Sequence, residues 1–322
     1  MYDNVDFKLS ILDNLGVDFL KETPRYFDVT SEHAFENGFA ICGSLKDDNA
    51  GNYKITVSNR GITIKDGSLC KYHLGNNCQT LSRSETQRAI EKLSDTLHLP
   101  IDKAKVSRID VAQNFIVKHP TQVYYNYLGT LKNSTRSEIS NGGGGVETLY
   151  YQKRLGCFVF YDKVNEIIRK RQEVPDLFDN RNVLRVERRH TSRLPETFNV
   201  ECVTAQMLYD ENFYIKVIDE WKSNYLNIDK INDISLNFEA MRGKKDLQKM
   251  GVLALIQMRG GKLNILNEIK TAYKMGTLTK KQEYDLRAEI NEACKLSAGL
   301  TMKSDAIAEL DTKVKDAVRF YR

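Results

Sequence analysis

Three strand-like stretches carry the side chains that could do chemistry. They are VSRIDVAQNFIV (106–117), CFVFY (157–161) and NVLRVERRH (182–190), and each alternates β-branched or aromatic residues with polar ones. Successive side chains of a strand point to opposite faces, so each stretch has an apolar face and a polar face. If the three pair in one antiparallel sheet, the polar face gathers two carboxylates, a phenol and several cations. The ordinary alternative is a merely solvated face, which antiparallel sheets often have.

The residues on the polar face suit attack of a phenol on a phosphodiester. A tyrosine hydroxyl such as that of Tyr161 has a pKa of about 10 and is a weak nucleophile, so it needs a base or a metal nearby. The carboxylates of Asp110 and Glu187 suit Mg²⁺ or Mn²⁺, which also polarises a phosphoryl oxygen. Lys163 and Arg185 could offset the charge that develops on the phosphate.

The order and spacing of these motifs resemble the filamentous-phage gene II replication proteins over roughly residues 40–200. The shared features are GNN (75–77), a helix at 82–98 followed by Pro100, SRID (107–110), TLYYQKRLGCFVFYDK (148–163), Glu166 and LRVE (184–187). The trans-acting Rep proteins of plasmids carry similar Arg-x-Asp, Tyr-Asp-Lys and Arg-x-Glu strands, and Asp162 makes the chain resemble them at that point.

The resemblance implies rolling-circle initiation of DNA replication. One strand of a duplex origin is cut, which leaves a 5′ phosphotyrosine on the protein and a 3′-OH as primer, and the ends are rejoined after synthesis. It implies that Tyr161 is the nucleophile and that Asp110 and Glu187 bind the metal. Glu166, on the helix expected after Tyr161, could reach the same metal, although a solvated helix face is an equal alternative.

The sequence also offers alternatives for the nucleophile and for the metal ligands. Tyr150 and Tyr151, on the adjoining strand-like stretch, are the nearest rival nucleophiles. The five histidines include no His-hydrophobe-His pair, so a His-ligated metal is disfavoured, and His190 points away from Glu187 by alternation and is expected to be structural. GGGG (142–145) lacks the Lys-Ser/Thr of a phosphate-binding loop, so strand separation is expected to depend on a host helicase or on supercoiling.

Basic residues near the expected site are candidates for contacts with DNA phosphates. They are Arg136, Lys153, Arg154, Arg169, Lys170 and Arg171. The expected partners are the origin duplex and the nicked strand, with a host helicase and polymerase. A relaxase of a mobile element would use the same chemistry. A DNA-binding regulator without chemistry is a further alternative, in which KKQEYDLRAEINEACK (280–295) belongs to a helix-turn-helix.

The pattern predicts an α+β fold with a central antiparallel sheet of about five strands, helices on one face and the site on the other. Strands at 53–57 and 62–64 flank a hairpin turn at Asn59 and Gly61, and Ser82 with Glu85 forms a capping box for the helix at 82–98. The polar stretch 132–147, with its four glycines, is expected to be a flexible loop.

From residue 205 onward the periodicity is helical. The expected segments are 244–259, 262–275, 280–297 and 304–320, with Gly260, Gly261, Gly276 and Gly299 between them. We therefore expect a nicking domain at 1–204 and a helical domain at 205–322 that contacts DNA or forms a homodimer.

The composition of the 322 residues is that of a soluble protein, with 28% charged residues and a net charge of +5. This mild basic excess permits nucleic-acid binding but does not argue for it. No apolar run is long enough to span a bilayer, and the N-terminus has no basic region typical of a signal peptide. The six scattered cysteines favour reduced thiols, and hence a cytoplasmic location.

Overall fold

A computed structural model describes residues 1–11, 16–45, 53–140, 146–231, 233–234, 239, 241–259, 262–295 and 301–322. The glycines at 142–145 and Gly260, Gly261 and Gly299, for which the sequence predicts a loop and helix breaks, lie outside these ranges. No helix in the described part of the chain is both long enough and apolar enough to cross a membrane.

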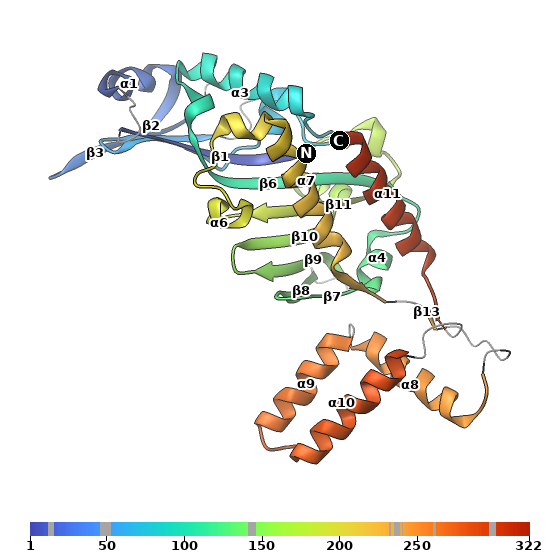
Figure 1. Cartoon of the computed structure of the whole chain (residues 1–322). Coiled ribbons are helices and arrows are strands. Elements are labelled where there is room, and N and C mark those ends of the chain that lie inside the picture. Colours follow the sequence, from blue (N-terminus) through green and yellow to red (C-terminus); the bar gives the residue numbers. More distant parts are fainter. Residues whose placement is uncertain are drawn as a thin grey trace.

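A ten-stranded sheet, antiparallel at every recorded pairing, forms the body of the molecule (Figure 1). Its order is β2-β3-β4-β5-β1-β6-β11-β10-β9-β8. The strands are β1 (Tyr2–Ser10), β2 (Phe27–Phe35), β3 (Gly38–Leu45), β4 (Lys54–Ser58), β5 (Gly61–Lys65), β6 (Lys105–Val117), β8 (Thr135–Ser140), β9 (Val146–Lys153), β10 (Gly156–Asp162) and β11 (Asn182–His190). The three strands predicted to carry the chemistry, β6, β11 and β10, are consecutive neighbours in the sheet.

Helices cover one face of this sheet and bury the apolar side chains of the strands (Figure 1). They are α3 (Arg83–Leu97), α4 (Thr121–Tyr127), α6 (Leu194–Phe198), α7 (Glu211–Leu226) and α11 (Asp305–Tyr321). Trp221 of α7, for example, packs 6.4 Å from the ring of Phe115 on β6. Three short helices complete this part of the chain: α1 (Val17–Glu22), α2 (Leu69–Leu74) and α5 (Lys163–Arg169).

The local signals in the first hundred residues are confirmed. Ser82 and Glu85 form the predicted capping box at the start of α3, whose apolar stripe enters the core. The chain leaves this helix at His98, which adopts a left-handed conformation. The turn between β4 and β5 ends at Gly61, whose φ of +140° suits a residue without a Cβ.

The prediction of about five strands was wrong. The strands for which the sequence predicts no range include β2, which is exposed at most positions. The strand β8, which is exposed at all but one position, lies within 132–147, so the prediction of a flexible loop there was wrong for residues 135–140. A strand that is solvated on both faces shows no apolar-polar alternation, so the period that reveals half-buried strands is missing from both.

The helical region after residue 205 divides into two parts. α7 and α11 pack with the core of the sheet, whereas α8 (Lys244–Met258), α9 (Lys262–Lys274) and α10 (Lys280–Lys295) form a separate cluster around Ile256, Ile265 and Ile290. Two small pairs of strands lie near this region: β7 (Leu128–Leu131) with β12 (Ile228–Lys230), and β13 (Asp233–Ile234) with β14 (Thr301–Met302). The division of the chain after residue 204 stays a prediction.

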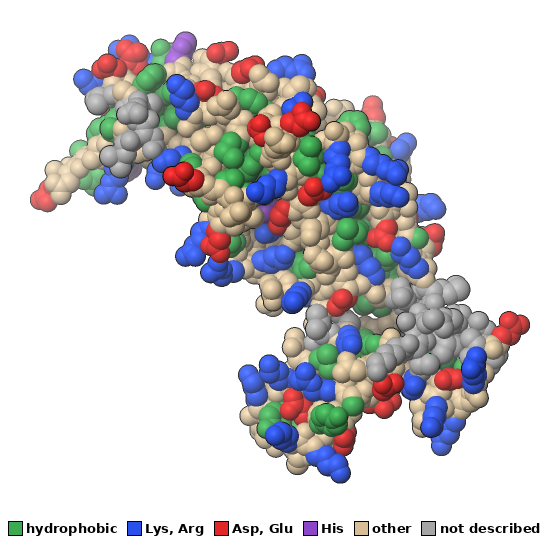
Figure 2. All heavy atoms as spheres, viewed as in Figure 1, with side chains coloured by type: hydrophobic (Ala, Val, Ile, Leu, Met, Phe, Trp, Pro, Cys, Tyr) green, Lys and Arg blue, Asp and Glu red, His purple; other side chains and the backbone are tan. Residues whose placement is uncertain are grey.

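Lys and Arg side chains are interspersed with Asp and Glu over the helix-covered face (Figure 2). This view shows no large area of a single charge, as expected from a net charge of only +5.

Candidate active site

The strand register brings the chemically active side chains onto the face opposite the apolar core. Tyr161 of β10 lies directly across from Arg185 of β11. Arg189 of β11 lies across from Asp110 of β6, and Glu187 stands two residues away on the same face. The sheet therefore places the phenol, both carboxylates and two guanidinium groups on three neighbouring strands.

The hydroxyl of Tyr161 donates a hydrogen bond of 3.0 Å to Oε2 of Glu187. Burial raises the pKa of Tyr161 well above its ordinary value, and the nearby Arg185 offsets only part of this effect. Burial alone would also raise the pKa of Glu187, but Arg189 and Arg185 outweigh it and hold that pKa at about 2. At neutral pH the pair is therefore a protonated phenol bonded to an ionised carboxylate.

Asp110 is fully buried and both of its carboxylate oxygens are bonded. Arg108 donates to Oδ1 at 3.0 Å and to Oδ2 at 2.6 Å, and the side-chain amide of Asn4 donates to Oδ2 at 2.9 Å. Burial, together with the charge of Glu187, raises the pKa of Asp110 to about 6 despite the contact with Arg108.

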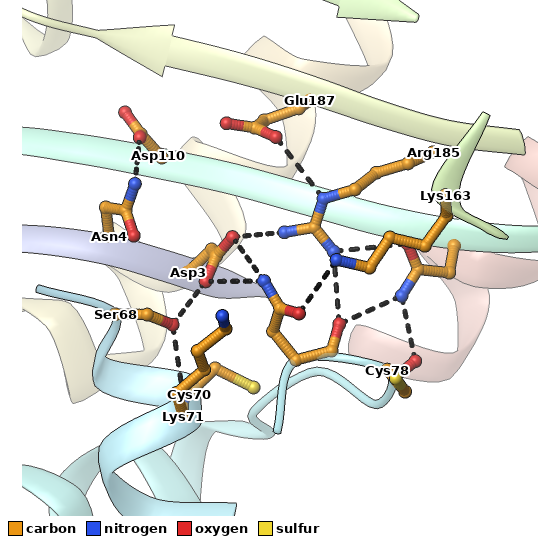
Figure 3. A network of polar contacts seen from close by, with 12 residues as sticks. Asp3, Asn4, Ser68, Cys70, Lys71, Cys78, Asp110, Lys163, Arg185 and Glu187 are labelled. Carbon is orange, nitrogen blue, oxygen red and sulfur yellow. Dashed lines mark hydrogen bonds and ion pairs between the residues drawn. The ribbon is translucent and has the colours of Figure 1, made fainter. Parts of the chain in front are cut away.

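The guanidinium of Arg185 links residues from four segments of the chain (Figure 3). It is 1% exposed and forms ion pairs with Asp3 of β1 and with Glu187. Its remaining hydrogen bonds go to the carbonyl oxygen of Asn77, at 3.2 Å, and to the side chain of Asn114. The side chain of Asn77 in turn donates to Asp3.

Asp3, Asn4 and Asn77 are site residues that the sequence reasoning did not identify. The alternation of Val5, Phe7 and Leu9 marks the first residues as a half-buried strand and could have placed Asp3 and Asn4 in the sheet. Asn77 belongs to GNN (75–77), a part of the resemblance for which the sequence predicts no role.

A cavity of about 210 Å³ opens beside Tyr161. Its lining is almost entirely polar and consists of Asp3, Asn4, Asp66, Ser68, Lys71, Asn77, Tyr161, Glu166, Lys170, Glu187 and Arg189. Arg185, Lys163 and Asp110 are not among these residues, since all three are buried behind them.

Lys163 and Glu166 stand at the first turn of α5, which follows β10 directly. Lys163 donates hydrogen bonds to Oδ1 of Asn77 at 2.8 Å and to Oε2 of Glu166 at 2.6 Å. Burial and the charge of Arg185 lower the pKa of Lys163. Burial alone would raise the pKa of Glu166, but Lys163 and Lys170 together hold it at about 2.

The donor groups around the cavity fit a hard divalent cation in their chemistry. Glu187 and Glu166 both line the cavity, and carboxylate oxygens are the ligands that Mg²⁺ and Mn²⁺ prefer. Among the described residues no three Asp, Glu, His or Cys side chains already form a ready-made metal site. A protein that binds Mg²⁺ through one or two carboxylates, with water and phosphate completing the shell, does not need one.

Five of the six basic residues predicted to contact DNA have hydrogen-bond or ion-pair partners within the protein, and Arg171 is the sixth of these residues. Arg136 donates to two backbone carbonyl oxygens and pairs with Glu138 at 2.6 Å. Lys153 donates to the side chain of Asn224 on α7. The ion pairs of the next three are Arg154 with Glu196, Arg169 with Glu147 and Lys170 with Glu166. Arg171 is exposed and has a φ of +54°.

The rival nucleophiles differ in position. Tyr151 faces the core, is fully buried, and donates to the carbonyl oxygens of Leu128 and Gly129. Tyr150 shares the face of Tyr161 but lies opposite Val159 on the neighbouring strand and does not line the cavity. His190 is buried on the core face, with its ring 5.1 Å from that of Phe198, as the alternation predicts.

Residues 1–224 match the N-terminal region of the family of phage replication-associated proteins of the gene II type. The chain belongs to this family. The match begins at β1 and ends within α7, so it covers every residue of the cavity lining and the whole ten-stranded sheet. No curated protein matches the chain.

Membership of the gene II family confirms the resemblance that the strand motifs indicated. It identifies the chain as a replication initiator. The matched region includes Tyr161, Glu187 and Asp110, whereas α8–α10 and α11 lie beyond it.

Proposed function

We propose that this replication initiator nicks one DNA strand at an origin through a 5′ phosphotyrosine at Tyr161 and rejoins the strand after synthesis. The observation that carries the proposal is the position of the Tyr161 hydroxyl. It lies on the wall of a polar cavity and bonds to an ionised, buried carboxylate, with Arg189 on the same wall.

The first step is an in-line displacement at phosphorus. The oxygen of Tyr161 forms a bond to the phosphorus, and the bond from the phosphorus to the 3′ oxygen of the preceding nucleotide breaks. Because the pKa of Tyr161 is raised, its proton must leave as the bond forms, and Glu187 is the hydrogen-bonded acceptor. The carboxylate passes the proton to water, since its own pKa is about 2, and the 3′ oxygen takes a proton from water to become the primer hydroxyl.

The cations of the site divide into two groups. Arg189, Lys71 and Lys170 line the cavity and would contact the phosphate directly. Arg185 and Lys163 are buried, and each bonds to a carboxylate that lines the cavity, so we assign them positioning roles.

A divalent ion, Mg²⁺ or Mn²⁺, would be held by Glu187 and Glu166 from the cavity and by Asp110. Each of these carboxylates would then share or give up its present ion pairs with Arg or Lys side chains. When bound, such an ion supplies Lewis-acid polarisation of the phosphoryl group. The chain has no nucleotide-binding loop motif, so a host helicase and polymerase would supply strand separation and synthesis.

The test is mass spectrometry of the covalent adduct trapped on an origin-derived oligonucleotide. Tyr161→Phe keeps the aromatic ring, so folding and DNA binding should survive, while nicking, the adduct and rejoining should vanish together. Tyr150→Phe and Tyr151→Phe are matched controls that should retain the adduct. An adduct formed by Tyr161→Phe would place the nucleophile elsewhere, and cleavage without any adduct would indicate a hydrolytic nuclease.

A further inference from the structure

Four lysines stand on the open face of the sheet, beside the cavity. Lys54 of β4, Lys65 of β5, Lys8 of β1 and Lys105 of β6 lie on four consecutive strands of the sheet order, and all four are exposed. We call them the lysine band.

The burial pattern places the lysine band on the same face as Tyr161. On β1, Val5, Phe7 and Leu9 enter the core, so Lys8 points the opposite way, together with Asn4. Asn4 donates to Asp110 of the site. The same argument applies to β4 and β5, where Ile55, Val57, Ile62 and Ile64 are the core residues.

The register places these like charges directly opposite one another. Lys8 pairs across the strands with Lys105, and Lys54 pairs with Lys65. Directly opposed like charges destabilise an antiparallel sheet, because the Cβ atoms are only about 5 Å apart. Two such pairs on adjoining strands therefore gather positive charge that a bound polyanion would neutralise more fully than Asp66 beside Lys54 and Asp6 near Lys65 do.

The charge of Lys54 is only weakly neutralised within the protein. Its ion pair with Asp66 measures 3.1 Å, but the two side chains are 72% and 53% exposed, and exposed pairs of this kind contribute little. Asp66 also lines the cavity beside Tyr161, so the band and the cavity are continuous along the sheet.

The dimensions suit a DNA backbone. Strands lie about 4.8 Å apart, so the three steps from β4 to β6 span about 14 Å. At about 3.4 Å of helix axis per nucleotide on each strand, this length of a duplex contains about four phosphates of one strand. Thr56 and Thr63, which face each other between the lysines, offer hydroxyl groups of the kind that bond phosphate oxygens.

We propose that the lysine band binds the sugar–phosphate backbone of the DNA whose scissile phosphate enters the Tyr161 cavity. This assignment rests on the proposed nicking function and adds the route by which DNA crosses the protein. The route follows the open face of β4, β5, β1 and β6. This route does not include the basic residues that the sequence predicts as DNA contacts. One of them, Lys153, donates to Asn224 of α7, which lies on the helix-covered face.

The test is the salt dependence of binding, measured by fluorescence anisotropy with a labelled 20-base-pair duplex and a labelled 20-nucleotide single strand. Lys8→Gln with Lys65→Gln removes two charges from exposed positions. On the duplex the slope of log K against log salt should become shallower by about 1.8, and on the single strand by about 1.4. Between 50 and 200 mM salt, the wild-type protein should then lose about 12-fold more duplex affinity than the variant.

The matched control is Lys222→Gln with Lys315→Gln, which removes the same charge from α7 and α11 on the helix-covered face. This control should keep the wild-type slope. An unchanged slope in the band variant, or an equal decrease in the control, would overturn the assignment.

The two proposals fail in different ways. If the band variant keeps the wild-type slope while the wild-type protein forms the Tyr161 adduct, the proposed DNA-binding role of the lysine band is wrong and the nicking function stands. If the slope falls as expected but no adduct forms, the band is a DNA-binding surface and the nicking function is wrong.

Discussion

Substitution of Glu187 by Gln should destabilise the protein even though it removes a charge and almost no volume. Glu187 is buried and accepts from Arg189 at 2.7 Å, from Arg185 at 3.3 Å and from Tyr161. Its pKa falls from 4.5 to about 2 on folding. At about 1.4 kcal/mol per pKa unit, this shift corresponds to roughly 3 kcal/mol of stability at pH 7.

The sign of the pH dependence follows from the lowered pKa. The stabilisation is fully present above pH 4.5 and is lost as the pH falls toward about 2, where the folded protein also takes up the proton. The difference in unfolding free energy between the wild-type protein and Glu187→Gln should therefore be about 2 to 3 kcal/mol at pH 7 and clearly smaller at pH 3.

Urea denaturation in EDTA, at pH 7 and pH 3, measures this difference without a contribution from divalent ions. Most of the other carboxylates titrate alike in both proteins and cancel. Asp110 does not, because the charge of Glu187 raises its pKa, and this lowers the expected difference at pH 7. Glu211→Gln is the matched control, because Glu211 forms an ion pair with Arg83 at 64% exposure and should contribute less than about 1 kcal/mol. A difference that is near zero at pH 7, or that does not shrink at pH 3, would refute the account of Glu187.

Two further substitutions have expected outcomes. The pKa of Asp110 is raised from 3.8 to about 6, so its ionised form costs folding energy as the pH rises through that range. Asp110→Asn removes that cost as well as the charge that Arg108 pairs with, so the stability of the variant relative to the wild-type protein should rise by about 1 kcal/mol from pH 5 to pH 7, while adduct formation falls. Thermal unfolding at pH 5 and pH 7 measures this change, and a difference in stability that stays constant would contradict it. Gly156 has a φ of +142°, and an added Cβ would lie 1.9 Å from the carbonyl oxygen of Arg189. Gly156→Ala should therefore lower the free energy of unfolding, measured by urea denaturation, by about 3 kcal/mol. Gly243→Ala, at a φ of +154° in open space, is the control and should cost only about 1 kcal/mol.

The part of the fold that could be predicted from sequence is the part that is half-buried. The alternation on β6, β10 and β11 predicted both their apolar faces and the common face of Tyr161, Asp110 and Glu187. The capping residues located α3, since Ser82 and Glu85 act through local backbone geometry.

The contacts that surround the site could not be predicted in the same way. Asp3 and Asn77 reach Arg185 through pairings between segments about 180 and 110 residues apart, and no local pattern records such pairings. Burial of Arg185 and Lys163 also depends on the loop that contains Asn77, which contacts both side chains. Their side chains therefore lie behind the cavity, although alternation alone shows them on its face.

The pairing of β13 with β14 brings together the two ends of the segment that carries α8–α10. Asp233 lies opposite Met302, so the chain leaves the body after α7 and returns to it for α11 at almost the same point. The helices α8–α10 are therefore joined to the body through the β13–β14 pair. A short turn between these two strands would replace the helices without displacing α11. The helices α8–α10 can therefore change in sequence or length without altering the sheet that carries the site.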